Sequence, residues 1–229
     1  MGEMVEFQSN GHNAGGYLAA PAQGAAPGVI VVQEWWGLNP QIKSVCDRLA
    51  AEGFTALAPD LYHGELAGHA EMDRAAQLMN AMPIDRAARD MSGAVGYLAG
   101  HDAVRGDGVG AIGFCMGGNL VLLLAAKRPD KVKAVVSYYG VIPDPNELDA
   151  SGVEAAVQGH YATADGFMPT EAARGVEQRL KEAGVDTQFH FYDAGHAFAN
   201  ETNPIGTYDE EHARTAWVRT LEFLRAHLG

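Results

Sequence analysis

The sequence contains few cysteines, few basic residues and no long apolar run. Only two of its 229 residues are cysteines, Cys46 and Cys115, and they form neither a CxxC pair nor a metal-type spacing. A disulfide framework and a cysteine-zinc site are therefore not expected. Lysine and arginine number 16 against 29 aspartates and glutamates, which gives a formal net charge of -13. This acidity disfavours nucleic acid or an anionic membrane surface as a partner.

No apolar stretch approaches the ~18 residues of a membrane-spanning helix. Residues 1–6 lack the basic and apolar regions of a secretory signal, so we expect a cytoplasmic protein with reduced thiols. With 47% hydrophobic residues, the chain has the composition of a globular protein, and its length fits one domain over residues 1–229.

Short apolar runs alternate with longer amphipathic ones. The runs typical of strands are 5–7, 16–19, 28–33, 54–60, 109–112, 133–140, 153–161 and 186–192. Helical patterns cover 40–50, 71–82, 85–98, 119–126, 169–183 and 208–228. The first two strands form a hairpin, and the alternation that follows predicts an α/β fold. We expect a mainly parallel, doubly wound sheet of about seven to eight strands with helices on both faces.

The hexapeptide GFCMGG at 113–118 joins a predicted strand to a predicted helix around Cys115. Small residues two before and two after the cysteine let the chain turn sharply, so that its side chain projects from the sheet edge. The N-terminus of the following helix favours a thiolate and a developing oxyanion. We interpret Cys115 as a nucleophile; the alternative is an inert cysteine in a glycine-rich packing turn. Cys46 lies on the apolar stripe of its helix and is expected to be a core residue.

A carboxylate and an imidazole also follow predicted strands. Asp165 follows the strand at 153–161, and His196 follows the last strand. The order nucleophile, acid, histidine is that of α/β-hydrolases, in which the imidazole takes the nucleophile's proton and the carboxylate orients the imidazole. Three other aspartates compete with Asp165 for the acid role: Asp60, Asp144 and Asp149.

The backbone N–H groups of Trp35 and Met116 are the expected oxyanion-hole donors. Met116 follows the nucleophile, and Trp35 lies in the loop after the early strand at 28–33. This arrangement also holds Glu34 beside the thiol. The alternative for Glu34 is a solvated carboxylate at a strand end.

Several stretches together resemble the dienelactone hydrolases (carboxymethylenebutenolidases) of the α/β-hydrolase superfamily. They are QEWWGLN at 33–39, APDLY at 58–62, GFCMGG at 113–118, YYG at 138–140, AD at 164–165 and HAF at 196–198. The resemblance implies an α/β-hydrolase fold without a large lid. It also implies a Cys115–His196–Asp165 triad that hydrolyses lactones or activated esters through an acyl-enzyme, with no cofactor and no metal.

The resemblance further implies that Glu34 accepts the thiol proton in the resting enzyme and is displaced when substrate binds. Two features depart from the family. Asn200 stands where the family has a carboxylate-binding arginine, and Arg74 is the only basic residue of the helix at 71–82. A buried substrate carboxylate without a charged partner costs several kcal/mol, so we expect the small-molecule substrate to be a neutral or differently substituted ester or lactone rather than dienelactone itself.

Two other classes of function stay open at this point. A thiol redox or stress protein could use Cys115 on the same fold, although Cys46 is not placed as a resolving cysteine. A non-catalytic binding domain is the third possibility, and in it the three polar groups would not converge. The expected oligomeric state is a monomer or a homodimer.

Overall fold

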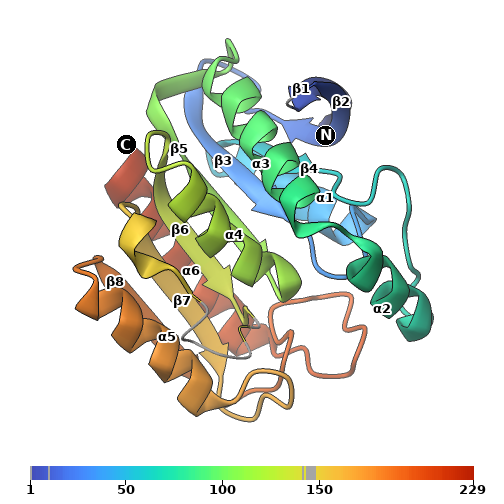
Figure 1. The fold of residues 1–229 in the computed structure, drawn as a ribbon, viewed down its shortest axis with the longest axis vertical. Coiled ribbons are helices and arrows are strands. Elements are labelled where there is room, and N and C mark those ends of the chain that lie inside the picture. Colours follow the sequence, from blue (N-terminus) through green and yellow to red (C-terminus); the bar gives the residue numbers. More distant parts are fainter. Residues whose placement is uncertain (1, 10, 141, 143–147) are drawn as a thin grey trace.

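A computed structural model describes the chain except for residues 1, 10, 141 and 143–147 (Figure 1). Its strands form one eight-stranded sheet in the order β1-β2-β4-β3-β5-β6-β7-β8. The strands are β1 (Glu3–Ser9), β2 (His12–Ala19), β3 (Ala26–Val32), β4 (Thr55–Pro59), β5 (Val104–Phe114), β6 (Val132–Tyr138), β7 (Ala156–Ala162) and β8 (Thr187–Tyr192). β1 and β2 form an antiparallel hairpin, β2 runs antiparallel to β4, and the pairs from β4 through β8 are parallel.

Helices cover both faces of this sheet. They are α1 (Pro40–Ala51), α2 (Met72–Ala81), α3 (Ile84–Ala99), α4 (Met116–Lys127), α5 (Thr170–Glu182) and α6 (Glu210–Leu228), with a short 3-10 helix η2 (Ala150–Gly152). In Figure 1, α3, α4 and α5 lie in front of the sheet, and α1 and α6 lie behind it. The predicted α/β class and the doubly wound, mainly parallel sheet are therefore confirmed.

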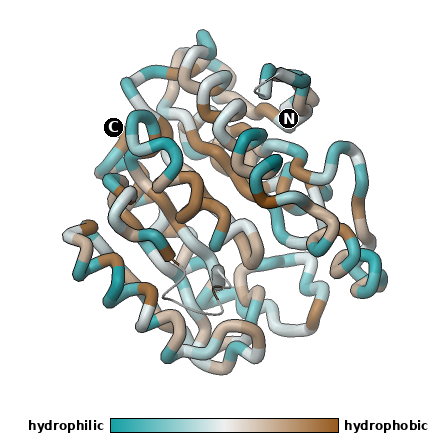
Figure 2. Tube along the Cα trace, viewed as in Figure 1, coloured by the Kyte–Doolittle hydropathy of each residue, from teal (hydrophilic) through white to brown (hydrophobic). Residues whose placement is uncertain are grey.

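β3 shows why the sheet is covered on both sides. All seven of its residues are buried, and successive side chains point to opposite faces. Ile30 and Val32 pack in the core under α3 and α4, whereas Val29 and Val31 pack in the core under α1 and α6. The most hydrophobic parts of the trace accordingly lie in the central strands and in α4 (Figure 2).

α1 begins as its sequence predicts. The side chain of Asn39 accepts a hydrogen bond from the N–H of Ile42 at 3.0 Å, and Pro40 occupies the first turn. Cys46 lies on the buried side of this helix and is fully buried, as expected of a core residue. Both cysteines are free.

Three predicted strands differ most from the observed ones at their N-terminal ends. β2 begins at His12 rather than residue 16, because its pairing with β1 continues as far as Ser9 and His12. β5 begins at Val104 rather than residue 109, because Ala26 of β3 pairs with Val104 before a register shift. The residues between Val104 and Val109 are polar and glycine-rich and lack the apolar pattern of a strand, so the sequence did not indicate this start. β7 begins at Ala156 rather than residue 153, since the chain forms η2 immediately before it. No helix among the described residues is long and apolar enough to span a membrane.

Candidate active site

Cys115 lies in the turn between β5 and α4, as the sequence predicts. Its backbone has φ 52°, in the left-handed region that non-glycine residues rarely adopt. The N–H of Cys115 donates to the carbonyl oxygen of Tyr138 on β6 at 3.0 Å. The strained conformation is thus held in place by the neighbouring strand.

The glycines around Cys115 are required by close backbone packing. A Cβ on Gly113 would overlap the carbonyl oxygen of Gly117, and a Cβ on Gly117 would overlap that of Val32 in β3. A Cβ on Gly118 would lie 2.7 Å from the Cα of Gly140. Real Cβ atoms do not approach other atoms this closely, so only glycine fits at these three positions. The turn is thereby packed against β3 and the end of β6.

His196 and Asp165 form a buried pair. Nδ1 of His196 and Oδ2 of Asp165 are 2.7 Å apart, with 6% and 1% of the two side chains exposed. The other carboxylate oxygen, Oδ1, accepts hydrogen bonds from the N–H groups of Phe167 and Met168 at 2.7 and 2.9 Å. The carboxylate can therefore fix both the tautomer and the orientation of the imidazole.

Neighbouring side chains also hold the imidazole of His196. The ring centroids of Tyr139 and Phe167 lie 5.1 and 4.9 Å from that of His196. The hydroxyl of Thr207 donates to the backbone carbonyl of His196. Nε2 of His196 is buried and has no hydrogen-bond partner among the residues that the structure describes. This nitrogen is the one that a general base would use.

The competing aspartates have other contacts. Asp60 accepts hydrogen bonds from the N–H groups of Tyr62 and Gly64 in its own loop. Asp149 accepts the N–H of Ser151 at the start of η2. Asp144 lies outside the described residues. The geometry therefore favours Asp165 for the acid role.

Cys115 and His196 line the same cavity, which has a volume of about 480 Å³. Its walls come from the end of α2, the first residue of α3 and the N-terminal part of α4, and the rest comes from loops at the carboxyl ends of β3, β5, β7 and β8. The lining residues are Glu34, Trp35, Trp36, Met79, Met82, Ile84, Cys115, Met116, Asn119, Leu120, Phe167, His196, Ala197, Pro204 and Ile205. In this parallel sheet, the cavity lies where ligands are expected to bind.

Glu34 is buried rather than solvated at a strand end. Its Oε2 accepts a hydrogen bond from Nδ2 of Asn200 at 2.7 Å, and its Oε1 accepts one from the Tyr139 hydroxyl at 3.3 Å. Burial raises the pKa of Glu34 to about 7, although both hydrogen bonds and the nearby His196 act in the opposite direction. A carboxyl group with a pKa near neutrality can exchange a proton with its surroundings.

Burial also dominates the state of the thiol. It raises the pKa of Cys115 far above that of an exposed cysteine, and the nearby Glu34 raises it further. The N–H of Met116 at the start of α4 lowers the pKa of Cys115, but this effect is smaller. The sequence-based expectation that the helix N-terminus favours a thiolate is therefore outweighed in this structure. At neutral pH the resting cysteine is a thiol.

Trp35 and Met116, the expected oxyanion-hole residues, both line the cavity beside Cys115. The Trp35 ring packs edge-on against Trp36, with centroids 5.0 Å apart. The hydroxyl of Tyr62 donates to Sδ of Met116 at 3.6 Å. These contacts hold the two segments that carry the expected oxyanion-hole donors.

The sequence analysis missed the two residues that hold Glu34. Asn200 was considered only because it is not an arginine, and Tyr139 only as part of a short motif. The positive φ of Tyr139, 39°, marks it as a constrained position, but backbone angles cannot be read from a sequence.

Comparisons with known proteins agree with this geometry. The sequence model of the Dienelactone hydrolase family matches residues 14–228. The chain is 36% identical over 222 residues to the carboxymethylenebutenolidase of Pseudomonas sp. strain P51, covering 94% of this chain and 91% of that protein. It is 37% identical over 235 residues to Protein usf of Aquifex pyrophilus, covering all of both chains. A crystal structure from Klebsiella pneumoniae with the provisional name dienelactone hydrolase superposes with a TM-score of 0.86, at 28% identity and 99% coverage of each chain.

The raised pKa of Glu34 predicts a pH-dependent contribution to stability. In the folded state Glu34 holds its proton up to a pH of about 7, whereas the unfolded chain releases it near 4.5. Between these values the folded state binds more protons, so Glu34 makes the protein less stable as pH rises through this window. The loss across the window is on the order of 3 kcal/mol. Urea denaturation of wild type and Glu34→Gln at several pH values measures this loss of unfolding free energy.

Glu34→Gln removes the titrating group but keeps an oxygen that can accept the Asn200 hydrogen bond. The difference in unfolding free energy between variant and wild type is expected to grow in favour of the variant from pH 4.5 to 7. Glu154→Gln, the same substitution at an exposed glutamate that forms no ion pair with the described residues, serves as a control in which the difference stays flat. A flat difference for Glu34→Gln as well would contradict the raised pKa.

Proposed function

Because the chain belongs to the dienelactone hydrolase family and is a hydrolase, we propose that it cleaves lactones or activated esters through an acyl-enzyme on Cys115. The observation that carries this proposal is the buried His196–Asp165 pair. Nε2 of His196 has no partner among the described residues, and His196 lines the same cavity as Cys115. A nucleophile, a base and a group that orients the base are the set that acyl transfer requires.

The reaction uses each group in turn. The thiol proton passes to Glu34 and from there to His196, which becomes an imidazolium. The resulting thiolate attacks the substrate carbonyl carbon and forms a carbon–sulfur bond as the carbonyl π electrons move to oxygen. Collapse of the tetrahedral intermediate breaks the bond to the alkoxy oxygen, which takes a proton from His196 and leaves as an alcohol. His196 then removes a proton from water, and the resulting attack releases the carboxylic acid and restores the thiol. Asp165 stabilises the imidazolium in both steps.

Two backbone donors stabilise the intermediate in this proposal. The negative charge on the former carbonyl oxygen develops beside the sulfur, where the N–H groups of Trp35 and Met116 are available. Donors held in place before the reaction require no reorganisation when the charge appears, and each is worth roughly 3–4 kcal/mol in comparable sites.

Glu34 is the proposed acceptor of the thiol proton. Its pKa of about 7 lets it exist as a carboxylate or as an acid at neutral pH, whereas the buried thiol does not ionise by itself. The charge of a deprotonated Glu34 also opposes formation of a thiolate beside it. Transfer of the thiol proton to Glu34 would neutralise the carboxylate, and displacement of Glu34 by substrate would move it away from the sulfur. The nucleophilic thiolate therefore forms when substrate is bound.

The cavity favours a neutral substrate. The part of its wall away from the reacting groups consists mainly of methionine, leucine, isoleucine and phenylalanine side chains, and its lining among the described residues includes no lysine or arginine. Asn200 is occupied by its hydrogen bond to Glu34 and is not free to bind a substrate carboxylate. An anionic group in this cavity would be desolvated next to Glu34 without a cation to offset the cost.

The redox alternative gains no support from the structure. Cys46 is fully buried in α1, both cysteines are free, and Cys46 does not line the cavity that Cys115 lines, so it is not placed to resolve a Cys115 oxidised from the cavity. The pairing of His196 with Asp165 also serves no evident purpose in a sensor. A cytoplasmic location, a monomeric or homodimeric state and the lack of a nucleic-acid or membrane partner stay predictions of the sequence.

Substitution of the triad tests the proposed roles. Cys115→Ala and His196→Ala should each lower kcat for p-nitrophenyl acetate by on the order of 10³-fold or more, because triad members act as a unit. Asp165→Asn should lower it less, since the nucleophile and base remain. A His190→Gln variant provides the control, at a half-buried histidine on β8 outside the cavity. Activity that survives Cys115→Ala would exclude the cysteine as nucleophile.

The proposed proton transfer to Glu34 predicts a change in both turnover and thiol reactivity. Glu34→Gln removes the acceptor and the negative charge, so kcat should fall while the apparent pKa for alkylation of Cys115 by iodoacetamide moves down. Asn200→Asp provides a matched change at the residue that donates a hydrogen bond to Glu34. It adds a negative charge there, so it should raise the apparent pKa for alkylation of Cys115. Unchanged turnover and an unchanged alkylation pKa in Glu34→Gln would remove Glu34 from the mechanism.

The charge preference can be measured with two esters of similar length. p-Nitrophenyl butyrate is neutral, and the mono-p-nitrophenyl ester of succinic acid carries a carboxylate at the far end of its acyl chain. We expect kcat/KM for the neutral ester to be higher by roughly 10-fold or more, which corresponds to about 1.4 kcal/mol. Dienelactone should be assayed beside them. Equal or better turnover of the anionic ester would contradict the inferred substrate class.

A further inference from the structure

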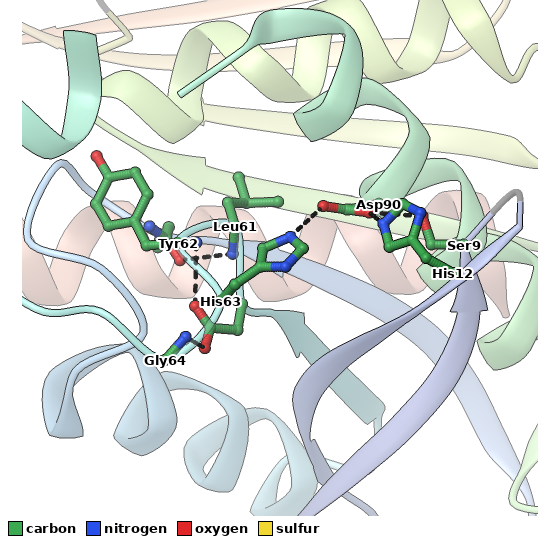
Figure 3. Close-up of polar contacts among 9 residues, drawn as sticks. Ser9, His12, Leu61, Tyr62, His63, Gly64 and Asp90 are labelled. Carbon is green, nitrogen blue, oxygen red and sulfur yellow. Dashed lines mark hydrogen bonds and ion pairs between the residues drawn. The ribbon is translucent and has the colours of Figure 1, made fainter. Parts of the chain in front are cut away.

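A second cluster of polar side chains lies away from the hydrolase cavity. Asp90 of α3 is fully buried, and its two carboxylate oxygens face two imidazoles. Oδ1 lies 3.0 Å from Nε2 of His12, and Oδ2 lies 2.8 Å from Nε2 of His63. Figure 3 shows both imidazoles beside Asp90, and the two rings are stacked with their centroids 6.0 Å apart. None of these residues lines the hydrolase cavity.

Three separate segments hold the cluster together. His12 is the first residue of β2, and Ser9 at the end of β1 donates its hydroxyl to Oδ1 of Asp90 at 2.5 Å. α3 lies very close to this hairpin, because a Cβ on Gly93 would be 2.7 Å from the carbonyl oxygen of Gln8. Asp90 is therefore fixed beside the hairpin both by packing and by a hydrogen bond.

The loop after β4 holds the third member. The carboxylate of Asp60 accepts hydrogen bonds from the N–H of Tyr62 at 3.1 Å and from that of Gly64 at 2.6 Å, on either side of His63 (Figure 3). His63 itself has φ 54°, a conformation that costs energy for a residue with a side chain. The loop thus holds His63 in a strained conformation that directs its imidazole toward Asp90.

The chemistry of the donor set is that of a divalent metal site. Two imidazole nitrogens and one carboxylate oxygen lie within 4.8 Å of one another. Zinc is commonly bound by such nitrogen and oxygen donors, with a fourth position left to water when the protein supplies three. Ser9 would act as the outer partner that orients a ligating carboxylate. The imidazoles are 39% and 34% exposed, so an ion can reach the site from solvent.

The charge of the site also fits a cation. Among the described residues, Asp90 forms ion pairs only with these two histidines and with no lysine or arginine. A fully buried carboxylate is stable only when it is paired or coordinates a metal. Neutral imidazoles can donate hydrogen bonds to Asp90, but they bring no charge. A divalent ion would take the place of both donated protons and would balance the negative charge of the Asp90 carboxylate.

We propose that His12, His63 and Asp90 bind one Zn²⁺ ion, with water completing the coordination. The ion would connect the β1–β2 hairpin, the loop after β4 and α3. The site is independent of the proposed hydrolase mechanism, since it shares no residue with the cavity. Its role is structural stabilisation of this edge of the sheet.

Isothermal titration calorimetry with ZnCl₂ tests the proposal directly. The protein should carry no affinity tag, be treated with a chelator and contain Cys115→Ser, so that zinc does not bind the active-site thiol. About one zinc ion per chain is expected, because three ligand atoms define one tetrahedral site. His12→Gln and His63→Gln should each weaken binding by on the order of 10-fold or more, and the double variant should abolish it.

His227→Gln is the matched control, because His227 also faces a carboxylate, that of Asp186 at 3.6 Å, but has no second histidine there. Its zinc affinity should equal that of the parent. At a zinc concentration of ~100 times Kd, the melting temperature of the parent should rise by about 5–10 °C, and that of the double variant should not. Undetectable zinc binding in the parent would overturn the proposal. Unchanged affinity in the His12 and His63 variants would overturn it as well.

Discussion

The close packing of the 113–118 turn against β3 and β6 is the constraint on which the hydrolase site depends. Gly113, Gly117 and Gly118 each sit where a Cβ would collide with backbone atoms, so the turn can form only with glycine at these positions. The same packing forces Cys115 into a left-handed conformation that projects its side chain into the cavity. It also brings the end of β3, and with it Glu34, beside the sulfur.

Burial then determines the protonation states in the site. Water is largely excluded around Glu34 and Cys115, and this exclusion raises the pKa of both groups. The resting site therefore holds a neutral thiol next to a carboxyl group that titrates near neutrality. Such a site is protected from oxidation and alkylation because the thiolate is the reactive form of cysteine. The proposed displacement of Glu34 by substrate would connect nucleophile formation to binding.

Local sequence patterns were sufficient to predict the elements and most of the candidate site. The alternation of apolar and amphipathic runs indicated the α/β class. The glycines around Cys115 identified the turn, because the need for residues without a Cβ is a local feature of the chain. Asp165 and His196 could be placed because strand ends of a parallel sheet meet at one edge. The residues that pair across the fold could not be predicted in this way.

Those pairs depend on contacts between residues far apart in the chain. Asn200 and Glu34 are 166 positions apart, and Asp90 lies 78 positions from His12. The balance of effects on the Cys115 thiol could not be predicted for a related reason. The helix N-terminus is a local feature, whereas the burial of Cys115 and the approach of Glu34 arise only from the tertiary structure.

The central claim is that Cys115 carries the acyl group during turnover. Rapid acid quench of the enzyme during hydrolysis of p-nitrophenyl acetate, followed by peptide mass spectrometry, tests it most directly. The account predicts an acetyl group on the peptide that contains Cys115, present during turnover and lost when the substrate is exhausted. An enzyme that turns over without this adduct, or that carries the acetyl group on another residue, would contradict it.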